Sequence, residues 1–237
     1  MMAPEHVEVV PGFADFGIHA FTTTRRAGTY GSGSDEPARD VIGRWDALRA
    51  SLRERGVRRL ATATQVHGAR VLAHVSPWEG WLRADDADGH LAPDRGTAMA
   101  VTVADCVPVF IAHPSGACAV LHSGWRGTAA RIVERGIDAL LERGFAPPEL
   151  RIHLGPAICG RCYEVSADVV RQLMGHTPPA PERVDLRAII AGHARARGVA
   201  DVSISPTCTR CDNDRFFSHR AGDAGRHLGV VFAPPSG

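Results

Sequence analysis

The most informative segment of the sequence is ADCVPVFIAHPSGACAVLHSGWRGT, residues 104–128. Two short apolar segments, residues 107–112 and 117–121, flank a turn of sequence HPSG. Apolar runs joined by a short turn with proline and glycine predict two adjacent buried strands. If these strands pair as a hairpin, Cys106 at the start of the first lies beside His122 at the end of the second. A thiolate and an imidazole at one sheet edge are two of the ligands that Zn²⁺ prefers in proteins.

The composition limits the classes of protein to which the chain can belong. With 237 residues it can form one large domain or two small ones and bury a core without cross-links. The 27 basic and 26 acidic residues leave a formal net charge of +1, so we expect neither nucleic acid nor a membrane surface among its partners. No apolar run in the sequence approaches the roughly 18 residues of a membrane-spanning helix.

The cysteines are expected to be reduced thiols in a cytoplasmic protein. The first residues, MMAPEH, have neither the basic start nor the apolar stretch of a signal peptide. Disulfides are rare in cytosolic proteins, where cysteine patterns more often indicate metal binding or catalysis.

Hydrophobic periodicity predicts helices and strands that interleave without strict alternation. Apolar residues at helical spacing predict helices over residues 40–55, 128–143, 165–174 and 186–197. Short apolar or β-branched runs predict strands over residues 18–24, 60–66, 70–75, 97–103, 107–112, 117–121, 149–154, 202–205 and 228–232. Stretches rich in polar residues, glycine or cysteine predict loops over residues 25–37, 78–96, 155–163 and 210–227. We therefore expect one mixed α/β domain spanning residues 1–237 rather than a regular series of βαβ units.

A catalytic zinc site usually has three protein ligands and an open fourth position, so a third ligand is needed. His67 follows a β-branched run and precedes a glycine, which predicts that it stands at a strand end, as Cys106 and His122 do. Spacing alone does not single out these three residues, because the chain has 12 histidines and 6 cysteines. The alternative is that the two histidines are ordinary strand-end residues and that Cys106 is a buried thiol.

Five motifs in a fixed order favour the metal site over that alternative. They are TQVHGA at residues 64–69, ADCVP at 104–108, HSGWRGT at 122–128, GPAI with CYEV within 155–165, and CT with FSHR within 208–220. Together they resemble the laccase-domain, or YfiH-like, family of multifunctional purine nucleoside phosphorylases, formerly called polyphenol oxidases. The resemblance runs from about residue 21 to residue 231, which is nearly the whole chain.

This resemblance implies a fold, a metal and an activity. The implied fold is a single α/β sandwich with a central mixed sheet. The zinc ligands of the family correspond to His67, Cys106 and His122, which are therefore the expected Zn²⁺ ligands and part of the catalytic site, with Cu²⁺ as the alternative metal. The implied reactions are phosphorolysis of purine nucleosides such as adenosine, inosine or methylthioadenosine, and hydrolytic deamination of adenosine. Purine nucleosides and phosphate are thus the expected small-molecule partners, and we expect a monomer or a weak homodimer.

Asp105, next to Cys106, is the candidate general acid or base. In deamination, zinc would lower the pKa of a bound water toward about 7, and that water would attack the purine carbon that carries the amino group. The alternative role of Asp105 is to accept a hydrogen bond from a histidine ligand and so orient it.

Phosphorolysis also requires a phosphate site. Arg126, Gly127 and Thr128 precede a predicted helix, where free backbone N–H groups and the helix dipole attract anions. Arg126 adds a bidentate donor, and Arg25 is a second candidate. The alternatives are that the guanidinium of Arg126 stacks on Trp125 and that Arg25 is an ordinary loop charge.

Other interpretations remain open. Two C-x-x-C pairs, Cys159 with Cys162 and Cys208 with Cys211, can form a structural zinc site, a reducible disulfide or plain buried thiols. A cysteine hydrolase would use Cys106 as its nucleophile. A copper-dependent phenol oxidase would need an axial ligand such as methionine, and the 4 methionines lie outside the motifs. A non-catalytic metal-binding protein would have a zinc without an open ligand position.

Overall fold

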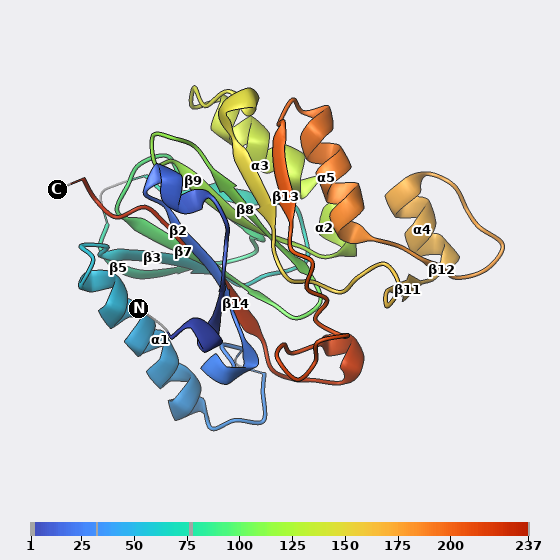
Figure 1. Cartoon of the computed structure of the whole chain (residues 1–237), viewed down its shortest axis with the longest axis horizontal. Helices are drawn as coiled ribbons and strands as arrows, with labels where there is room; N and C mark the ends of the chain where they lie inside the picture. Colours follow the sequence, from blue (N-terminus) through green and yellow to red (C-terminus); the bar gives the residue numbers. More distant parts are fainter. Residues whose placement is uncertain (1–2, 32, 76–77, 237) are drawn as a thin grey trace.

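The computed structural model describes residues 3–31, 33–75 and 78–236 of the chain. Two six-stranded mixed sheets face each other, and helices cover their outer faces (Figure 1). The expected mixed α/β fold is confirmed. Its architecture has four layers, with a helix, two sheets and a second group of helices stacked in that order.

The first sheet has the strand order β1-β2-β14-β7-β3-β5. Neighbouring strands are antiparallel from β1 to β7, whereas β7, β3 and β5 run parallel to one another. Its strands are β1 (Val7–Val9), β2 (His19–Thr23), β3 (Arg59–Ala63), β5 (Gly80–Ala84), β7 (Thr97–Val103) and β14 (His227–Phe232).

The second sheet has the strand order β13-β10-β8-β9-β6-β4. Its outer pairs, β13 with β10 and β6 with β4, are parallel, and the inner pairs are antiparallel. Its strands are β4 (Val71–Ala73), β6 (Gly89–Ala92), β8 (Val107–Ala112), β9 (Cys118–Ser123), β10 (Arg151–Leu154) and β13 (Asp201–Ile204).

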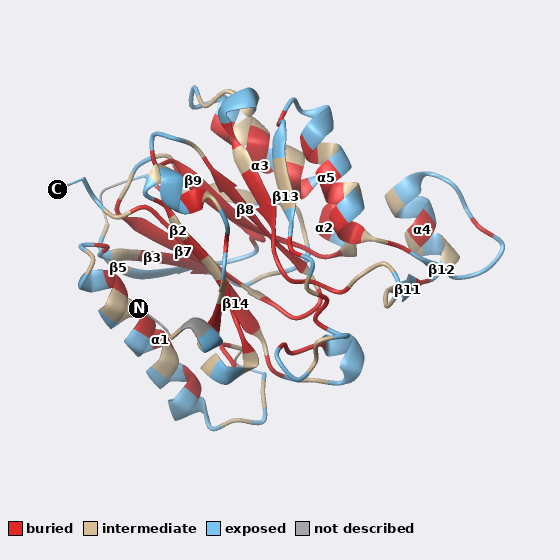
Figure 2. Ribbon diagram, in the orientation of Figure 1, coloured by how far each residue is buried: buried red, intermediate tan, exposed pale blue. Residues whose placement is uncertain are grey.

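The helices bury one face against the sheets and expose the other to solvent (Figure 2). In α1 (Ala38–Arg53), the buried residues recur every three or four positions and pack on the first sheet. They are Val41, Trp45, Leu48 and Leu52. The helices α3 (Ile132–Leu141) and α5 (Leu186–Ala196) cover the second sheet in the same way. Burial of each such aliphatic side chain stabilises the fold by roughly 1.5–3 kcal/mol.

The innermost core lies between the two sheets. Met99 and Val101 of the first sheet pack there with Phe110 and Val120 of the second sheet, and all four are almost completely buried. Because strands buried on both faces need apolar residues at every position, β8 and β9 read as continuous apolar runs rather than as alternating ones.

The hairpin expected from residues 104–128 is confirmed. β8 and β9 are antiparallel neighbours, with Pro108 opposite His122 and Val107 opposite Ser123. Cys106 therefore emerges from the start of β8 beside the end of β9, which carries His122.

Two expectations about secondary structure are wrong. Residues 78–96 contain the strands β5 and β6, because parallel pairing with β3 orders the polar edge strand β5 and the sheet core surrounds β6. The single helix expected over residues 128–143 is two helices, α2 (Trp125–Ala129) and α3. Arg131 adopts a left-handed conformation with φ 62° between them, which turns α3 onto the second sheet.

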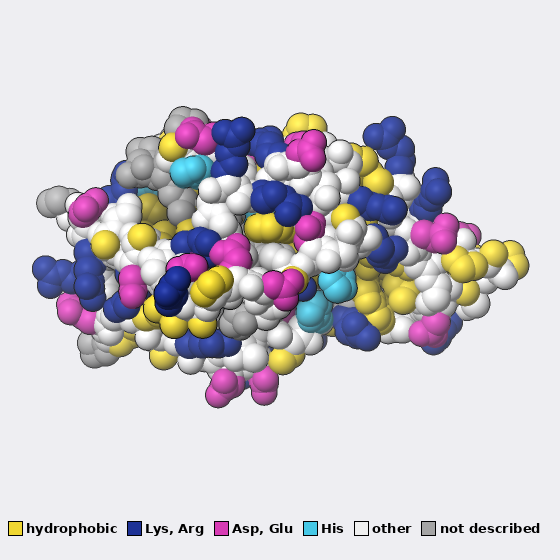
Figure 3. Space-filling view, turned by 90° about the horizontal axis from the view of Figure 1, so that it is seen from below, with side chains coloured by type: hydrophobic (Ala, Val, Ile, Leu, Met, Phe, Trp, Pro, Cys, Tyr) yellow, Lys and Arg dark blue, Asp and Glu magenta, His cyan; other side chains and the backbone are white. Residues whose placement is uncertain are grey.

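The remaining elements lie at the periphery. The helix α4 (Ala167–Met174) and the short pair β11 (Glu164–Val165) and β12 (Glu182–Arg183) project from one end of the molecule (Figure 1). Within the described ranges no helix has the length and apolarity needed to cross a bilayer. Basic and acidic side chains are interspersed on the face shown in Figure 3, in keeping with the formal net charge of +1.

Candidate metal centre

The structure brings His67, Cys106 and His122 together. One ligand atom from each residue lies within 4.8 Å of the others. The two imidazole rings have centroids 4.8 Å apart and planes at 77° to each other, so both can direct a nitrogen to a shared point. Two imidazoles and one thiolate match the ligand chemistry of a catalytic zinc site with an open fourth position.

The three residues reach this point from different parts of the chain. Cys106 and His122 are placed by the β8–β9 hairpin. His67 does not stand at a strand end as expected, since β3 ends at Ala63 and the histidine lies in the following loop. Its backbone has φ 59°, in the left-handed region that residues other than glycine rarely adopt. Something outside the loop must therefore hold this conformation.

Asp88, at the end of the stretch before β6, holds the loop. Its completely buried carboxylate accepts backbone N–H bonds from His67 at 2.9 Å, Gly68 at 2.7 Å and Val66 at 3.2 Å. The same carboxylate lies 2.8 Å from Nδ1 of His122. One aspartate thus orients both histidines, and sequence reasoning missed it. The available signal was an aspartate directly before the strand-forming residues 89–92, which resembles the placement of Cys106 before β8.

The charges of the trio are coupled. Burial alone would raise the pKa of the Cys106 thiol, but His122 and His67 together lower it to about 6. Burial would lower the pKa of His122, but the thiolate and Asp88 raise it to about 9. Burial likewise opposes ionisation of Asp88, yet the hydrogen bonds from His122 and the loop N–H groups lower the pKa of its carboxyl. The site therefore favours a thiolate, the form that binds a metal.

Two glycines leave room for these ligands. A Cβ atom at Gly124 would lie 2.9 Å from Sγ of Cys106 and 3.3 Å from Cδ2 of His67. A Cβ atom at Gly127 would lie 2.9 Å from the carbonyl oxygen of Gly68, so α2 can pack closely against the His67 loop. The donor set and the space beside the sulfur both fit a metal ion.

The trio lies in the wall of a cavity of about 610 Å³. This volume is within the roughly 300–1,000 Å³ typical of small-molecule sites. Aromatic side chains of Tyr30, Trp45 and Trp81 line the same cavity. The two indoles are stacked with their ring centroids 4.9 Å apart, and the indole N–H of Trp81 donates to Thr62 at 2.8 Å. The cavity thus combines a flat apolar surface with a wall that carries the candidate metal ligands.

Asp105 is close to the trio in sequence but its hydrogen bonds point elsewhere. Its Oδ1 accepts from the hydroxyl of Thr209 at 2.6 Å, and its Oδ2 accepts from the backbone N–H of Arg220 at 2.7 Å. The residue is buried and has φ 77°. The orienting contact proposed as an alternative for Asp105 is made by Asp88 instead.

The expected phosphate-binding segment has a different local structure from the one predicted. Arg126 is exposed, and its guanidinium lies 4.3 Å from the ring centroid of Trp125. Thr128 is buried, and its hydroxyl donates to the carbonyl of Gly124 at 2.9 Å and lies 2.9 Å from Oγ of Ser123. The Arg126 guanidinium stacks on Trp125 with one face and leaves its edge exposed. The Thr128 hydroxyl instead bonds to Gly124, the residue that precedes α2.

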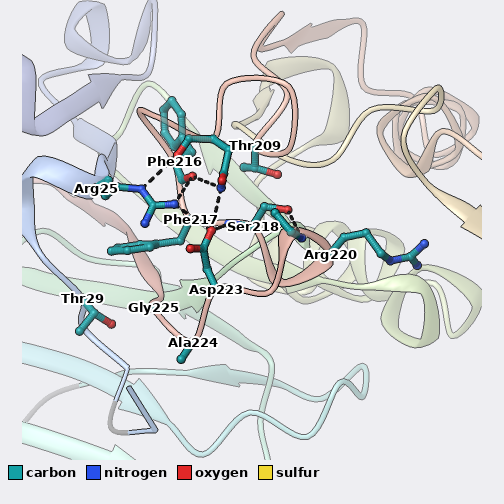
Figure 4. Close-up of polar contacts among 12 residues, drawn as sticks. Arg25, Thr29, Thr209, Phe216, Phe217, Ser218, Arg220, Asp223, Ala224 and Gly225 are labelled. Atoms are coloured by element: carbon teal, nitrogen blue, oxygen red, sulfur yellow. Dashed lines mark hydrogen bonds and ion pairs between the residues drawn. The ribbon is translucent and has the colours of Figure 1, made fainter. Parts of the chain in front are cut away.

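Arg25 is tied to the loop between β13 and β14 (Figure 4). Its guanidinium donates to the carbonyls of Asn213 and Phe216 and pairs with Asp223 at 2.8 Å. It also lies 4.4 Å from the ring centroid of Phe217. These contacts make Arg25 an anchor of the loop that carries the FSHR motif, and the loop contributes His219 and Arg226 to the cavity wall.

Similarity to known proteins covers most of the chain. The family model described as multi-copper polyphenol oxidoreductase laccase matches residues 24–234. A purine nucleoside phosphorylase of Streptomyces coelicolor is 36% identical over 182 residues, which cover 73% of this chain and 75% of the relative. A purine nucleoside phosphorylase of Mycobacterium tuberculosis is 33% identical over 233 residues, covering 91% and 92% of the two chains.

Solved structures show the same fold. The crystal structure of YlmD from Geobacillus stearothermophilus matches with a TM-score of 0.89 and 26% identity, over 99% of this chain and 98% of that one. YfiH of Bacillus licheniformis matches with a TM-score of 0.86 and 22% identity, over 98% of both chains.

Proposed function

Because the chain belongs to the family described as multi-copper polyphenol oxidoreductase laccase, as its motifs indicated, we propose that it is a zinc-dependent purine nucleoside phosphorylase. Its proposed substrates are adenosine, inosine and methylthioadenosine, and it is further proposed to deaminate adenosine, in the cytoplasm. The observation that carries this proposal is the convergence of His67, Cys106 and His122 in the wall of one cavity lined by aromatic rings.

Different residues of the chain are proposed to bind the metal, orient a ligand and bind the purine base. His67, Cys106 and His122 would hold the metal, which when bound supplies positive charge to stabilise negative charge that develops on the substrate. Asp88 keeps Nδ1 of His122 protonated, so that its other nitrogen is free to bind the metal. The stacked rings of Trp45 and Trp81 offer a flat surface for a purine base.

In phosphorolysis, a phosphate oxygen bonds to the sugar carbon C1′ while the bond from C1′ to the purine nitrogen breaks. The purine leaves with the bonding electrons and takes up a proton. In deamination, water adds to the purine carbon that bears the amino group, and ammonia leaves. Asp105 is the proposed acid or base for these proton transfers. Asp105 directly precedes Cys106 in the sequence, and its buried carboxylate would need to exchange the hydrogen bond from Thr209 for one to the substrate.

Product analysis tests the proposal directly. Zinc-loaded protein is incubated with each nucleoside, with and without phosphate, and the products are separated by chromatography. Phosphorolysis requires phosphate and gives free base with a sugar 1-phosphate, whereas deamination gives inosine and ammonia without it. His122→Ala should abolish both, and His176→Ala, at an exposed histidine, should leave them unchanged. The proposal fails if the wild type releases none of these products or if His122→Ala is as active as the wild type.

Arg126 is the proposed main phosphate-binding residue, next to Gly127. Arg25 and Thr128 would have to exchange hydrogen bonds that they already make in order to assist it. The exposed guanidinium of Arg126 can pair with phosphate while its face remains on Trp125. Arg126→Ala should raise the KM for phosphate by about 10-fold or more and affect deamination less, since removal of a charge-assisted contact costs roughly 1.5–3 kcal/mol. Arg135→Ala, at another exposed arginine, is the control. Equal loss of both activities would indicate a structural role.

A second candidate function rests on the proximity of the Cys106 sulfur to the His122 ring. A thiolate beside His122 can also be the nucleophile of a cysteine hydrolase. A metal-bound thiolate is shielded from alkylation, so rapid alkylation of Cys106 in zinc-loaded protein, with loss of activity, would favour the hydrolase. Oxidation of a catechol by the copper-loaded protein, absent with zinc, would instead favour the phenol oxidase.

A further inference from the structure

A second group of sulfur atoms lies outside the cavity. The Sγ atoms of Cys159, Cys162, Cys208 and Cys211 all lie within 4.8 Å of one another. The first pair follows β10 and the second pair follows β13. These two strands are parallel neighbours, so the loops that leave them emerge at the same edge of the second sheet. The topology therefore brings together two C-x-x-C pairs separated by 45 residues in the sequence (163–207).

The spacing of the sulfurs fits a shared ion better than a disulfide. The Sγ atoms of Cys162 and Cys211 are 3.4 Å apart. A disulfide requires about 2.05 Å between sulfurs. Four thiolates at about 2.3 Å from a tetrahedral zinc stand about 3.8 Å from one another. All six cysteines of the chain are free thiols in the structure, and the four sulfurs of this group lie within 4.8 Å of one another, a range that includes the tetrahedral value.

The backbone around the sulfurs is arranged for thiolate ligands. The N–H groups of Cys159 and Cys211 donate to Sγ of Cys208 at 3.2 and 3.4 Å. The N–H of Cys162 donates to the carbonyl of Cys159 at 2.9 Å, which closes a tight turn and turns both sulfurs of that pair to one side. Hydrogen bonds that orient ligands in this way are a regular part of metal sites.

We propose that Cys159, Cys162, Cys208 and Cys211 bind one structural zinc ion that fastens the loop after β10 to the loop after β13. Four thiolates in tetrahedral reach select zinc among common divalent metals and leave no coordination position open for substrate. This site differs from the proposed catalytic centre, which has three ligands and adjoins the cavity.

The proposed ion would hold in place residues that contact Asp105, which precedes Cys106 of the proposed catalytic centre. Thr209, next to Cys208, donates to Asp105 through its hydroxyl and to the carbonyl of Ala157 through its N–H at 3.2 Å. Tyr163, next to Cys162, packs with its ring centroid 4.9 Å from the guanidinium carbon of Arg220. Loss of the ion would increase the mobility of both loops and so weaken the contacts of Asp105 with Thr209 and Arg220.

Metal counting by native mass spectrometry tests the proposal. Wild-type protein purified in reducing, zinc-containing buffer should carry two zinc ions per chain. Cys162→Ser/Cys211→Ser should carry one, and His122→Ala should also carry one. Cys118→Ala removes a buried thiol that belongs to neither group and should keep two ions. In the double variant, hydrogen exchange at the backbone amide of Thr209 should accelerate by about 10-fold or more.

Alkylation of the wild-type thiols gives a second test that does not depend on whether the variants fold. The four thiols should resist iodoacetamide in the zinc-loaded protein and react after a strong chelator is added. The proposal is overturned if the four thiols are labelled without chelator, or if they form a disulfide between Cys162 and Cys211. It is also overturned if the wild type carries a single zinc ion that is lost only in His122→Ala, or if the four thiols bind iron instead of zinc. The metal count and the labelling do not depend on nucleoside turnover, so the proposal can fail or succeed independently of the proposed function.

Discussion

Replacement of Asp88 by asparagine should weaken zinc binding at the proposed catalytic centre about 10- to 100-fold. Asp88 accepts four hydrogen bonds, from the backbone N–H groups of residues 66–68 and from Nδ1 of His122. Asparagine keeps the shape but converts one oxygen into a donor. Each carboxylate oxygen accepts two of the four bonds, so either orientation of the amide sets its NH₂ group against two donors.

Both orientations of the asparagine damage a ligand. If the NH₂ group takes the place of Oδ1, His122 must accept at Nδ1 and carry its proton on the nitrogen that should bind the metal. If it takes the place of Oδ2, the backbone of Val66 and Gly68 loses its acceptor and the left-handed conformation of His67 is released. Loss of such orienting partners typically lowers metal affinity 10- to 100-fold, or about 1.4–2.7 kcal/mol.

The assay is a competition titration of zinc against a chromophoric chelator at neutral pH. A parallel titration of His122→Ala identifies the part of the curve that belongs to this centre. Asp86→Asn is the matched control, because Asp86 is an exposed aspartate of the same acidic stretch and asparagine tolerates its left-handed backbone. An affinity of Asp88→Asn within about threefold of the wild type would refute the argument that this carboxylate orients the ligands.

Three further results are expected. Gly124→Ala should lower zinc affinity by about 10-fold or more with little change in unfolding temperature, since its Cβ would lie 2.9 Å from the ligand sulfur. The control is Gly43→Ala, which lies in helix α1 with open space around it and should stabilise the fold slightly. Equal zinc affinities of Gly124→Ala and the wild type would contradict the steric argument. Burial lowers the pKa of His74 to about 4 and of His90 to about 3, so these rings stay neutral in the folded state while the unfolded chain binds protons below about pH 6.5. Stability should therefore be lost as the pH falls from about 6.5 to 4, by about 2 kcal/mol per ring at pH 5, and a ring midpoint above pH 6 in an NMR titration would oppose this. Thr209→Val should lower the free energy of unfolding by about 1–3 kcal/mol in urea denaturation, because a buried carboxylate loses a hydrogen bond of 2.6 Å, and an unchanged value would show that this bond is dispensable.

The local parts of the fold could be predicted from the sequence. The β8–β9 hairpin follows from two apolar runs and a four-residue turn, so the proximity of Cys106 and His122 could be inferred within one short stretch. Most helices and strands can be predicted to within a few residues for the same reason, since a hydrophobic periodicity of 2 or 3.6 residues is a local property of the sequence. The strand β5 cannot be predicted from hydrophobic periodicity, because its two large apolar residues, Trp81 and Leu82, are adjacent in sequence and both exposed.

The contacts that complete both candidate metal sites depend on the tertiary structure. His67 and Asp88 come from loops that follow different strands, and only the packing of the two sheets brings them to the hairpin. The C-x-x-C pairs were visible as pairs, but their meeting depends on the parallel pairing of β10 with β13. The available ligand types and the local helices and strands can therefore be inferred without the tertiary structure. The folded chain decided which of them meet, because closing a long loop is unfavourable until the burial of a whole core compensates for the lost chain entropy.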